Sequence, residues 1–240
     1  MSEWVIIKRN LMRMAMPVLT ALAIFGTLAG SNEPVIGMLQ DTWIADISRK
    51  LHIGNTILFN LSVGFLVSLF FWFLVVRVPE LRKRAILKRN LTRQYQYFKE
   101  DVIQILLFAA ASTYDSELVK KLTDYREFKR YFSENQNAKW YDALNGLQSD
   151  TDYLNDLLVE VELLADEISY VLNNIAIDDE EVHFFFKRLS THVYRLKNAS
   201  IYTSDHAKYL GNFVWELLAR WSMVDGQRKE DIVQDMIDKI

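Results

Sequence analysis

The sequence predicts an all-α protein: a two-helix transmembrane hairpin followed by a cytosolic bundle of six to seven helices. Turn-forming residues are scarce, since the 240-residue chain has three prolines and eight glycines, and no proline follows Pro79. Two apolar runs near the N-terminus have the length of membrane spans. The rest of the sequence repeats apolar residues at the three-to-four-residue period of a helix.

The first apolar run, residues 12–31, allows two interpretations. Its uncharged part, residues 14–32, has 19 residues and lies near the lower limit for a span. Its basic lead and small-residue end also resemble a cleaved signal peptide. We favour a retained span, because cleavage would leave only a short outside portion and because the run is longer than an ordinary signal core. Pro17 is expected in the first turn, where a helix tolerates proline.

The second apolar run, residues 53–76, is the stronger span. Its 24 residues carry no charge. As a helix it reaches about 36 Å, which exceeds the hydrocarbon thickness of about 30 Å. The sequence therefore predicts a membrane hairpin over residues 1–78, with a short outside loop at 32–52, and a cytosolic helical domain over residues 79–240.

Basic residues flank the hairpin on one side. Lys8, Arg9 and Arg13 precede the first span, and seven basic residues against one acid lie between positions 77 and 93. Positive flanks mark the cytoplasmic side of a membrane, so both termini are expected in the cytoplasm. We call residues 77–93 the basic collar. Six of its residues are expected at the lipid headgroups: Arg77, Arg82, Lys83, Arg84, Lys88 and Arg89. A nucleic-acid patch is the alternative; we disfavour direct nucleic-acid binding because the domain beyond the collar is acidic.

Both spans carry stripes of small and polar residues: Thr20, Ala23 and Thr27 in the first, and Thr56, Asn60, Gly64 and Ser68 in the second. Gly26 and Gly30 add a G-x-x-x-G pattern. Small residues permit close helix packing in lipid. The stripes therefore indicate either packing within one hairpin or a homo-oligomer in which Asn60 and its neighbours line a pore or hydrogen-bond between helices. No charged residue lies mid-span, which argues against an ion or proton transporter.

The cytosolic domain reads as successive amphipathic helices. Pro79 is well placed to begin a helix, and the apolar stripe from Leu87 to Ala109 predicts a long helix that continues from the second span, with its basic half at the headgroups and its apolar half buried. Further helices are expected over the following segments: 115–132, 138–147, 150–174, a helix with the four acids 178–181 in its first turn, one capped by Ser204, and a short last one near 232–240. The helix at 150–174 has coiled-coil-like spacing over three heptads.

An acidic surface distinguishes this domain. Between Trp140 and Phe186 there are twelve acids and no lysine or arginine. Six of them lie on the solvent side of the helix at 150–174: Asp152, Asp156, Glu160, Glu162, Asp166 and Glu167. Such a face either keeps the domain soluble and away from anionic lipid or binds a basic partner, for example a nucleic-acid-binding protein.

No catalytic motif is evident. The pair Glu180-x-x-His183 matches half of a di-iron motif, but the second half is missing. Arg188-x-x-x-His192 is similar to the Arg-x(4–6)-His motif of HEPN ribonucleases, but it is one residue short and Leu189 replaces the usual polar residue. Cysteine is absent, which excludes disulfides and thiolate ligands. We expect no enzyme activity, cofactor or metal site.

The order of the two spans, the basic collar and the helical domain resembles the small two-span membrane effectors of bacterial anti-phage systems associated with retrons or CRISPR loci. The resemblance implies a domain held silent by a cytosolic protein or ribonucleoprotein partner and released to assemble in the membrane. We therefore expect a non-enzymatic inner-membrane effector with a membrane-perturbing or pore-forming hairpin. The alternative is a membrane-anchored scaffold or signalling adaptor in which the hairpin is only an anchor.

Overall fold

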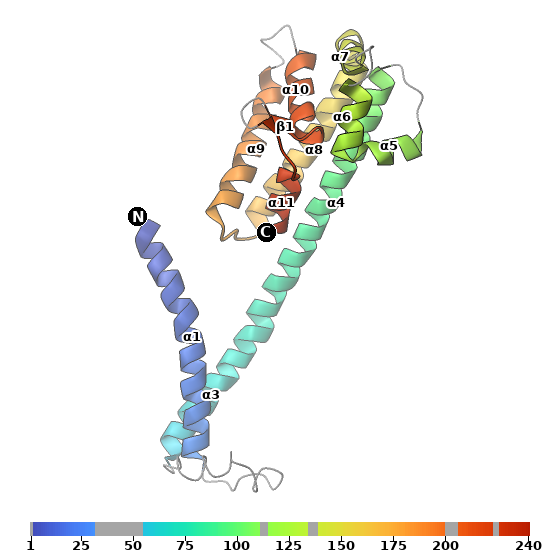
Figure 1. Cartoon of the computed structure of the whole chain (residues 1–240). Helices are drawn as coiled ribbons and strands as arrows, with labels where there is room; N and C mark the ends of the chain where they lie inside the picture. Colours follow the sequence, from blue (N-terminus) through green and yellow to red (C-terminus); the bar gives the residue numbers. More distant parts are fainter. Residues whose placement is uncertain (1, 32–54, 111–114, 134–138, 200–205, 223–225) are drawn as a thin grey trace. The chain divides into compact units, whose positions relative to one another are not determined.

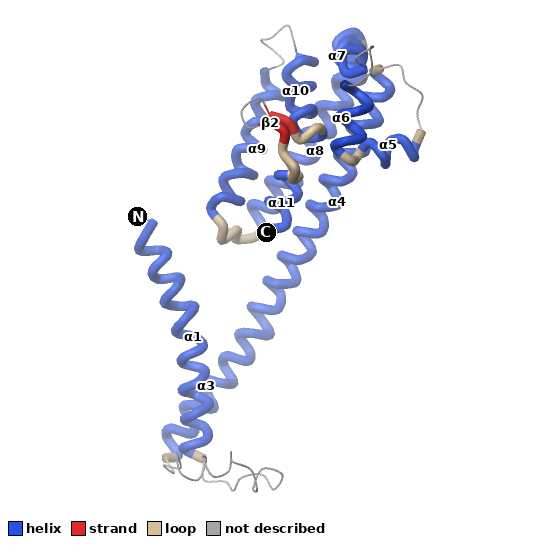
Figure 2. Tube along the Cα trace, in the orientation of Figure 1, coloured by secondary structure: helices blue, strands red, loops and turns tan. Residues whose placement is uncertain are grey.

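The computed structural model describes residues 2–31, 55–110, 115–133, 139–199, 206–222 and 226–240, and these are predominantly helical (Figure 1; helices blue in Figure 2). The predicted outside loop at 32–52 and the Ser204 cap lie outside these residues. The chain divides into two compact units, residues 1–81 and 82–240, each described by itself.

The first unit is built from α1 (Ser2–Gly30) and α3 (Thr56–Trp72), which pack against each other. The side chain of Asn55 caps α3 by accepting hydrogen bonds from the amides of Ile57 and Leu58. Pro17 lies inside α1 and not in its first turn. The expectation for Pro17 was wrong because α1 begins well before the apolar run from which the helix start was inferred.

One helix of the described residues, the continuous stretch Thr56–Ala109, is long and apolar enough to cross a membrane. Only 6% of its most apolar 18-residue stretch is buried. The apolar side chains of that stretch are therefore not packed in a protein core, and they are suited to a lipid environment. The apolar part of α1, Ala15–Gly30, falls short of the 18-residue length of a spanning helix.

Pro79 lies within this continuous helix and does not begin a new one. A π-helical turn, η2 (Phe73–Arg77), joins α3 to α4 (Val78–Ala109). The amide of Val78 donates to the carbonyl of Phe73, five residues back. In a regular α-helix the proline ring would clash with the carbonyl four residues earlier. The wider π turn just before Pro79 offers a physical reason why the helix continues.

The second unit contains most of α4 and seven further helices in its described residues: α5 (Ser116–Leu122), α6 (Tyr125–Ser133), α7 (Lys139–Ser149), α8 (Thr151–Asn174), α9 (Glu180–Ala199), α10 (His206–Leu218) and α11 (Ile232–Asp238). A short antiparallel pair, β1 (Trp221–Ser222) and β2 (Gly226–Gln227), lies between α10 and α11. The expected single helix at 115–132 is two helices, because Asp124 caps α6 by accepting from the amides of Arg126 and Glu127. The bundle therefore has more helices than the six to seven expected.

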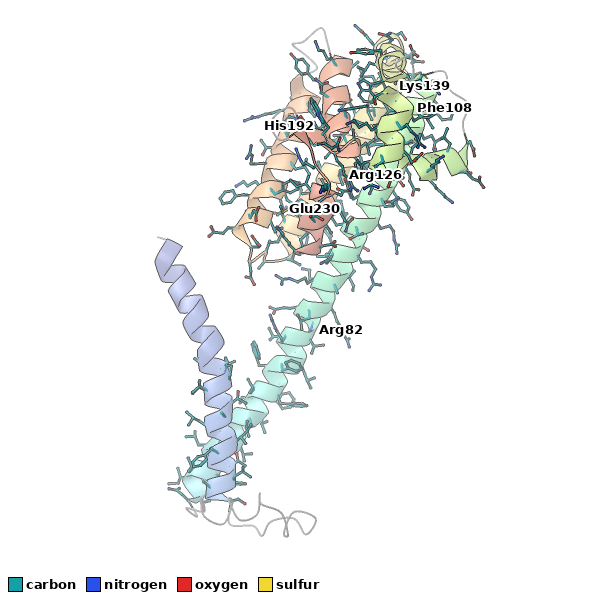
Figure 3. The ribbon with its side chains drawn as sticks, viewed as in Figure 1. Arg82, Phe108, Arg126, Lys139, His192 and Glu230 are labelled. Atoms are coloured by element: carbon teal, nitrogen blue, oxygen red, sulfur yellow. The ribbon has the colours of Figure 1, made fainter. Side chains whose placement is uncertain are left out.

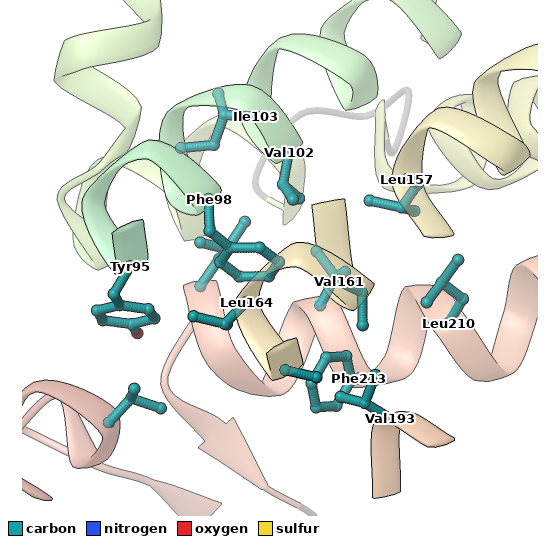
Figure 4. Packing of buried hydrophobic residues seen from close by; sticks show 14 of the residues in the cluster. Tyr95, Phe98, Val102, Ile103, Leu157, Val161, Leu164, Val193, Leu210 and Phe213 are labelled. Carbon is teal, nitrogen blue, oxygen red and sulfur yellow. The ribbon is translucent and has the colours of Figure 1, made fainter. Parts of the chain in front are cut away.

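The core of this unit lies between α4, α8, α9 and α10 (Figure 4). Its largest fully buried side chains include Tyr95 and Phe98 of α4, Phe128 and Phe132 of α6, and Phe186 of α9. The apolar positions of the α8 heptads also enter it, as the sequence predicts: Leu157, Val161, Leu164, Ile168 and Val171 are buried. The core includes side chains of α11, so the described C-terminal segment is part of the bundle.

Candidate functional site

The contact between α1 and α3 is formed by the small residues of the first predicted span. Ala23 and Ala29 are buried, and a Cβ added to Gly30 would lie 2.8 Å from the amide nitrogen of Phe59. A Cβ added to Gly26 would lie 2.2 Å from the hydroxyl of Ser62. These distances leave no room for a side chain, so the G-x-x-x-G pattern here permits close packing within one chain.

The polar stripe of the second predicted span lies away from this contact. Thr56, Asn60, Gly64 and Ser68 are all exposed, and a Cβ added at Gly64 would meet no atom within 4 Å in the described part of the chain. Ser62, two residues from Gly64, is the buried polar residue of α3. The two stripes therefore have different surroundings: the stripe of α1 lies next to α3, whereas the stripe of α3 is exposed.

Three of the four hydroxyl groups of the stripes are satisfied by their own helices, whereas the amide of Asn60 is not. Thr20 donates to the carbonyl of Met16 at 2.7 Å, Thr27 to Ala23 at 2.8 Å, and Ser68 to Gly64 at 2.8 Å. Among the described side chains and backbone groups of residues 15–31 and 55–110, none hydrogen-bonds the side chain of Asn60. This amide, one turn inside α3, therefore carries two donors and an acceptor without a partner in these ranges.

The basic collar is divided between exposed and engaged side chains. Arg82, Lys83 and Arg89 are exposed, and Arg82 stands out from α4 in Figure 3. Arg77 is also exposed and pairs with Glu80 at 3.6 Å. Arg84 and Lys88 instead donate to backbone carbonyls of the second unit, those of Ala176 and Asp238. Two of the six predicted headgroup residues therefore also tie α4 to the bundle.

The acidic surface of α8 is also not uniform. Asp152, Asp156 and Asp166 are exposed, whereas Glu160, Glu162 and Glu167 are half-buried. Glu162 pairs with Lys197 of α9, which removes it from the set available to an external partner.

Asp156 and Glu160 line an open pocket of about 230 Å³ between α8 and α4. On the α4 side the pocket contains Asp101, which sequence reasoning did not associate with α8 because it lies more than fifty positions earlier. Partial burial, and then the charges of Asp101 and Asp156, raise the pKa of Glu160. Burial and Glu100 likewise raise the pKa of Asp101. The pocket therefore concentrates negative charge that favours a basic group.

A second polar cluster, which the sequence did not indicate, surrounds Asp231 at the start of α11. The hydroxyl of the buried Tyr95 donates to Asp231 Oδ1 at 2.8 Å. Lys99 and Arg220 lie 3.5 and 3.7 Å from Asp231 Oδ2, and Asp231 also caps α11. Burial, and secondarily the Asp231 carboxylate, raises the pKa of Tyr95 well above its ordinary value. The cluster fixes the segment before α11 to α4.

The motif residues considered for catalysis do not converge on a site. His192 is exposed on α9 (Figure 3) and its ring lies 5.4 Å from that of Phe213. Arg188 is exposed, and His183 makes an edge contact with Phe184. In the described ranges no three His, Asp or Glu side chains are grouped so that they could hold a metal ion. No protein family, curated protein or solved structure matches the chain.

Proposed function

We propose that the protein is a non-enzymatic effector of the bacterial inner membrane, acting in anti-phage defence. In this proposal residues 12–31 and 53–76 form a two-span hairpin with both termini in the cytoplasm. The helical domain at 79–240 binds or senses a cytosolic protein or ribonucleoprotein partner. That partner controls whether the hairpins of several copies assemble and perturb the membrane.

The observation that supports this proposal is the open polar stripe of α3, and Asn60 above all. An amide without a partner is costly in an apolar environment. The cost is removed when Asn60 hydrogen-bonds an identical residue of a second copy, as polar residues do between membrane helices. Gly64, one turn further, carries no side chain and lets two α3 helices approach closely. A hairpin that served only as an anchor would not need this open stripe.

The shared face would place several polar side chains along one assembly axis. Two spans of one chain do not enclose a path, so a leak requires several hairpins around that axis. An exposed aromatic side chain outside the stripe, such as Phe70 at 59% exposure, would then face the lipid. The expected activity is dissipation of the membrane potential.

The test is inducible expression of the full chain in bacteria, with and without phage infection, followed by a potential-sensitive dye. Wild type is expected to depolarise the cells, Asn60→Leu to abolish the effect, and Asn60→Gln to retain it because the amide is kept. Phe70→Leu, a change at an exposed position of α3 outside the polar stripe, is the control and should behave as wild type. Expression of each variant in the membrane fraction is measured in parallel.

Two results would contradict the proposal. An unchanged potential in cells that express wild type, both uninfected and infected, would remove the membrane-perturbing role. Equal depolarisation by wild type and Asn60→Leu would remove the polar stripe from the mechanism. If an unrelated two-span anchor in place of residues 1–78 preserves protection against phage, the hairpin is only an anchor and the protein is a scaffold or adaptor.

A further inference from the structure

The outer faces of α8 and α9 lie side by side on the second unit. The two helices pack against each other through Glu162 with Lys197, and through Ser169 with Ser190, whose hydroxyls lie 3.2 Å apart. Each turns a buried stripe inward, including Leu164 on α8. The stripe opposite the core on each helix is therefore exposed on the same outer side of the bundle.

These two exposed stripes have opposite charge and similar apolar content. On α8 the stripe contains Asp166 between Leu163, 46% exposed, and Tyr170, 53% exposed. On α9 it contains the basic residues Arg188 and Arg195. Neither arginine forms an ion pair with a described residue, and the same holds for Asp166.

The α9 stripe also carries exposed aromatic side chains. Phe184 is 60% exposed and Tyr194 is 69% exposed. Aromatic residues and arginine are enriched in protein interfaces relative to the rest of the surface. The acidic and basic stripes thus have the composition of two halves of one interface.

We propose that a second copy of this chain covers this surface, with α8 of each copy against α9 of the other. The contacts that join Glu162 to Lys197 and Ser169 to Ser190 place Asp166 level with Val193, between Arg188 and Arg195. A two-fold axis parallel to the helices keeps these levels while it places α8 opposite α9 of the partner. Asp166 then meets the partner's basic stripe, and the same contact occurs twice, as an isologous dimer requires.

This inference names one partner of the acidic surface and rests on the proposed function in that it assigns the helical domain a role in assembly. It differs from the proposed membrane contact because it uses no residue of the hairpin. Dimers formed through the bundle would bring hairpins together in pairs. A basic partner protein that competed for Asp166 would then separate them.

Disulfide cross-linking of the full chain in native membranes tests the contact, because the chain has no cysteine of its own. Tyr170 and Thr191 lie at similar levels on the two stripes, so a copy with Tyr170→Cys should cross-link to a differently tagged copy with Thr191→Cys. When either variant is expressed alone, the two identical cysteines of a dimer lie on opposite sides of the two-fold axis, so no disulfide-linked dimer should form. A band confined to the mixture supports the inference.

Charge exchange provides the second measurement. Asp166→Lys, or Arg188→Glu with Arg195→Glu, should each cause loss of the mixed cross-link when introduced into both copies. It should return when one copy carries Asp166→Lys and its partner carries the two arginine substitutions. Lys120→Glu with Lys229→Glu, exposed basic residues outside the surface, is the control and should leave cross-linking unchanged.

The outcomes separate this inference from the proposed function. Absence of the mixed cross-link, while Gly64→Cys still forms dimers through α3, overturns the α8–α9 contact and leaves the membrane assembly standing. A mixed cross-link that persists in Asn60→Leu copies supports a contact independent of the hairpin. Equal cross-linking in the mixture and in each variant alone also overturns the inference, because it indicates contact without a defined interface.

Discussion

Replacing Gly26 and Ser62 by cysteine should lock α1 to α3 with a disulfide. A Cβ placed on Gly26 lies 3.4 Å from the Cβ of Ser62, close to the separation of about 3.5–4.5 Å in disulfides. The bond would close a ring of about 37 residues, which by loss of unfolded-chain entropy stabilises the hairpin by about 4 kcal/mol. Because the chain has no native cysteine, no other disulfide can form within it.

The assay is oxidation of the purified full chain in detergent, followed by non-reducing electrophoresis, thiol titration and thermal unfolding. The double variant is expected to lose both free thiols while it remains monomeric on the gel, and to unfold at higher temperature than its reduced form. The pair Gly26→Cys with Gly64→Cys is the control, because Gly64 is open to the outside of the hairpin. Retention of both thiols in the first pair, or equal intramolecular bonding in the two pairs, would refute the described packing of α1 on α3.

Three further predictions concern stability. Gly30→Ala should cost about 1–3 kcal/mol by overpacking, since its Cβ would lie 2.9 Å from the carbonyl oxygen of Asn55; thermal unfolding in detergent should show no such loss for Gly64→Ala. Folding raises the pKa of Tyr95, so its protonated phenol contributes fully to the free energy of unfolding below the ordinary value of 10.0, and this contribution is lost as pH rises above it. Urea unfolding should show this loss in wild type and a flatter pH profile in Tyr95→Phe. Asp101, whose pKa is also raised by folding, stabilises the fold more as pH falls; Asp101→Asn should therefore raise the unfolding temperature at neutral pH and reduce the gain on acidification.

Periodicity predicted the helices whose apolar stripes are long and regular. The heptad positions of α8 are an example, because their repeated spacing leaves only one face to bury. The break between α5 and α6 was missed because Leu118, Leu122 and Tyr125 keep a helical spacing across it. The decisive residue is Asp124, whose preference for a cap competes with its place in a continuous helix.

Relations between distant segments were not available from the sequence. The spacing of Gly26 and Gly30 indicates close packing, but it does not say whether Gly64 shares the same contact, since that depends on which face of α3 meets α1. Tyr95 reads as a member of an apolar stripe, and nothing near it in sequence points to Asp231, 136 positions away. The acidic surface was visible as composition, whereas its division between internal pairing and open pocket depends on the fold.

The participation of α11 in the core affects how the protein is made. The ribosome releases α1 and α3 first, so these helices are available for membrane insertion before the bundle is complete. The core, however, includes Val233 and Ile237 of α11 packed with residues that begin at Leu87, and domains generally fold as units during synthesis. The bundle therefore closes only after α11 has emerged, and until then the apolar stripes of α4 and α8 are open to chaperones. In the proposed function, insertion and folding are thus separated in time, because the hairpin can enter the membrane before the bundle is complete.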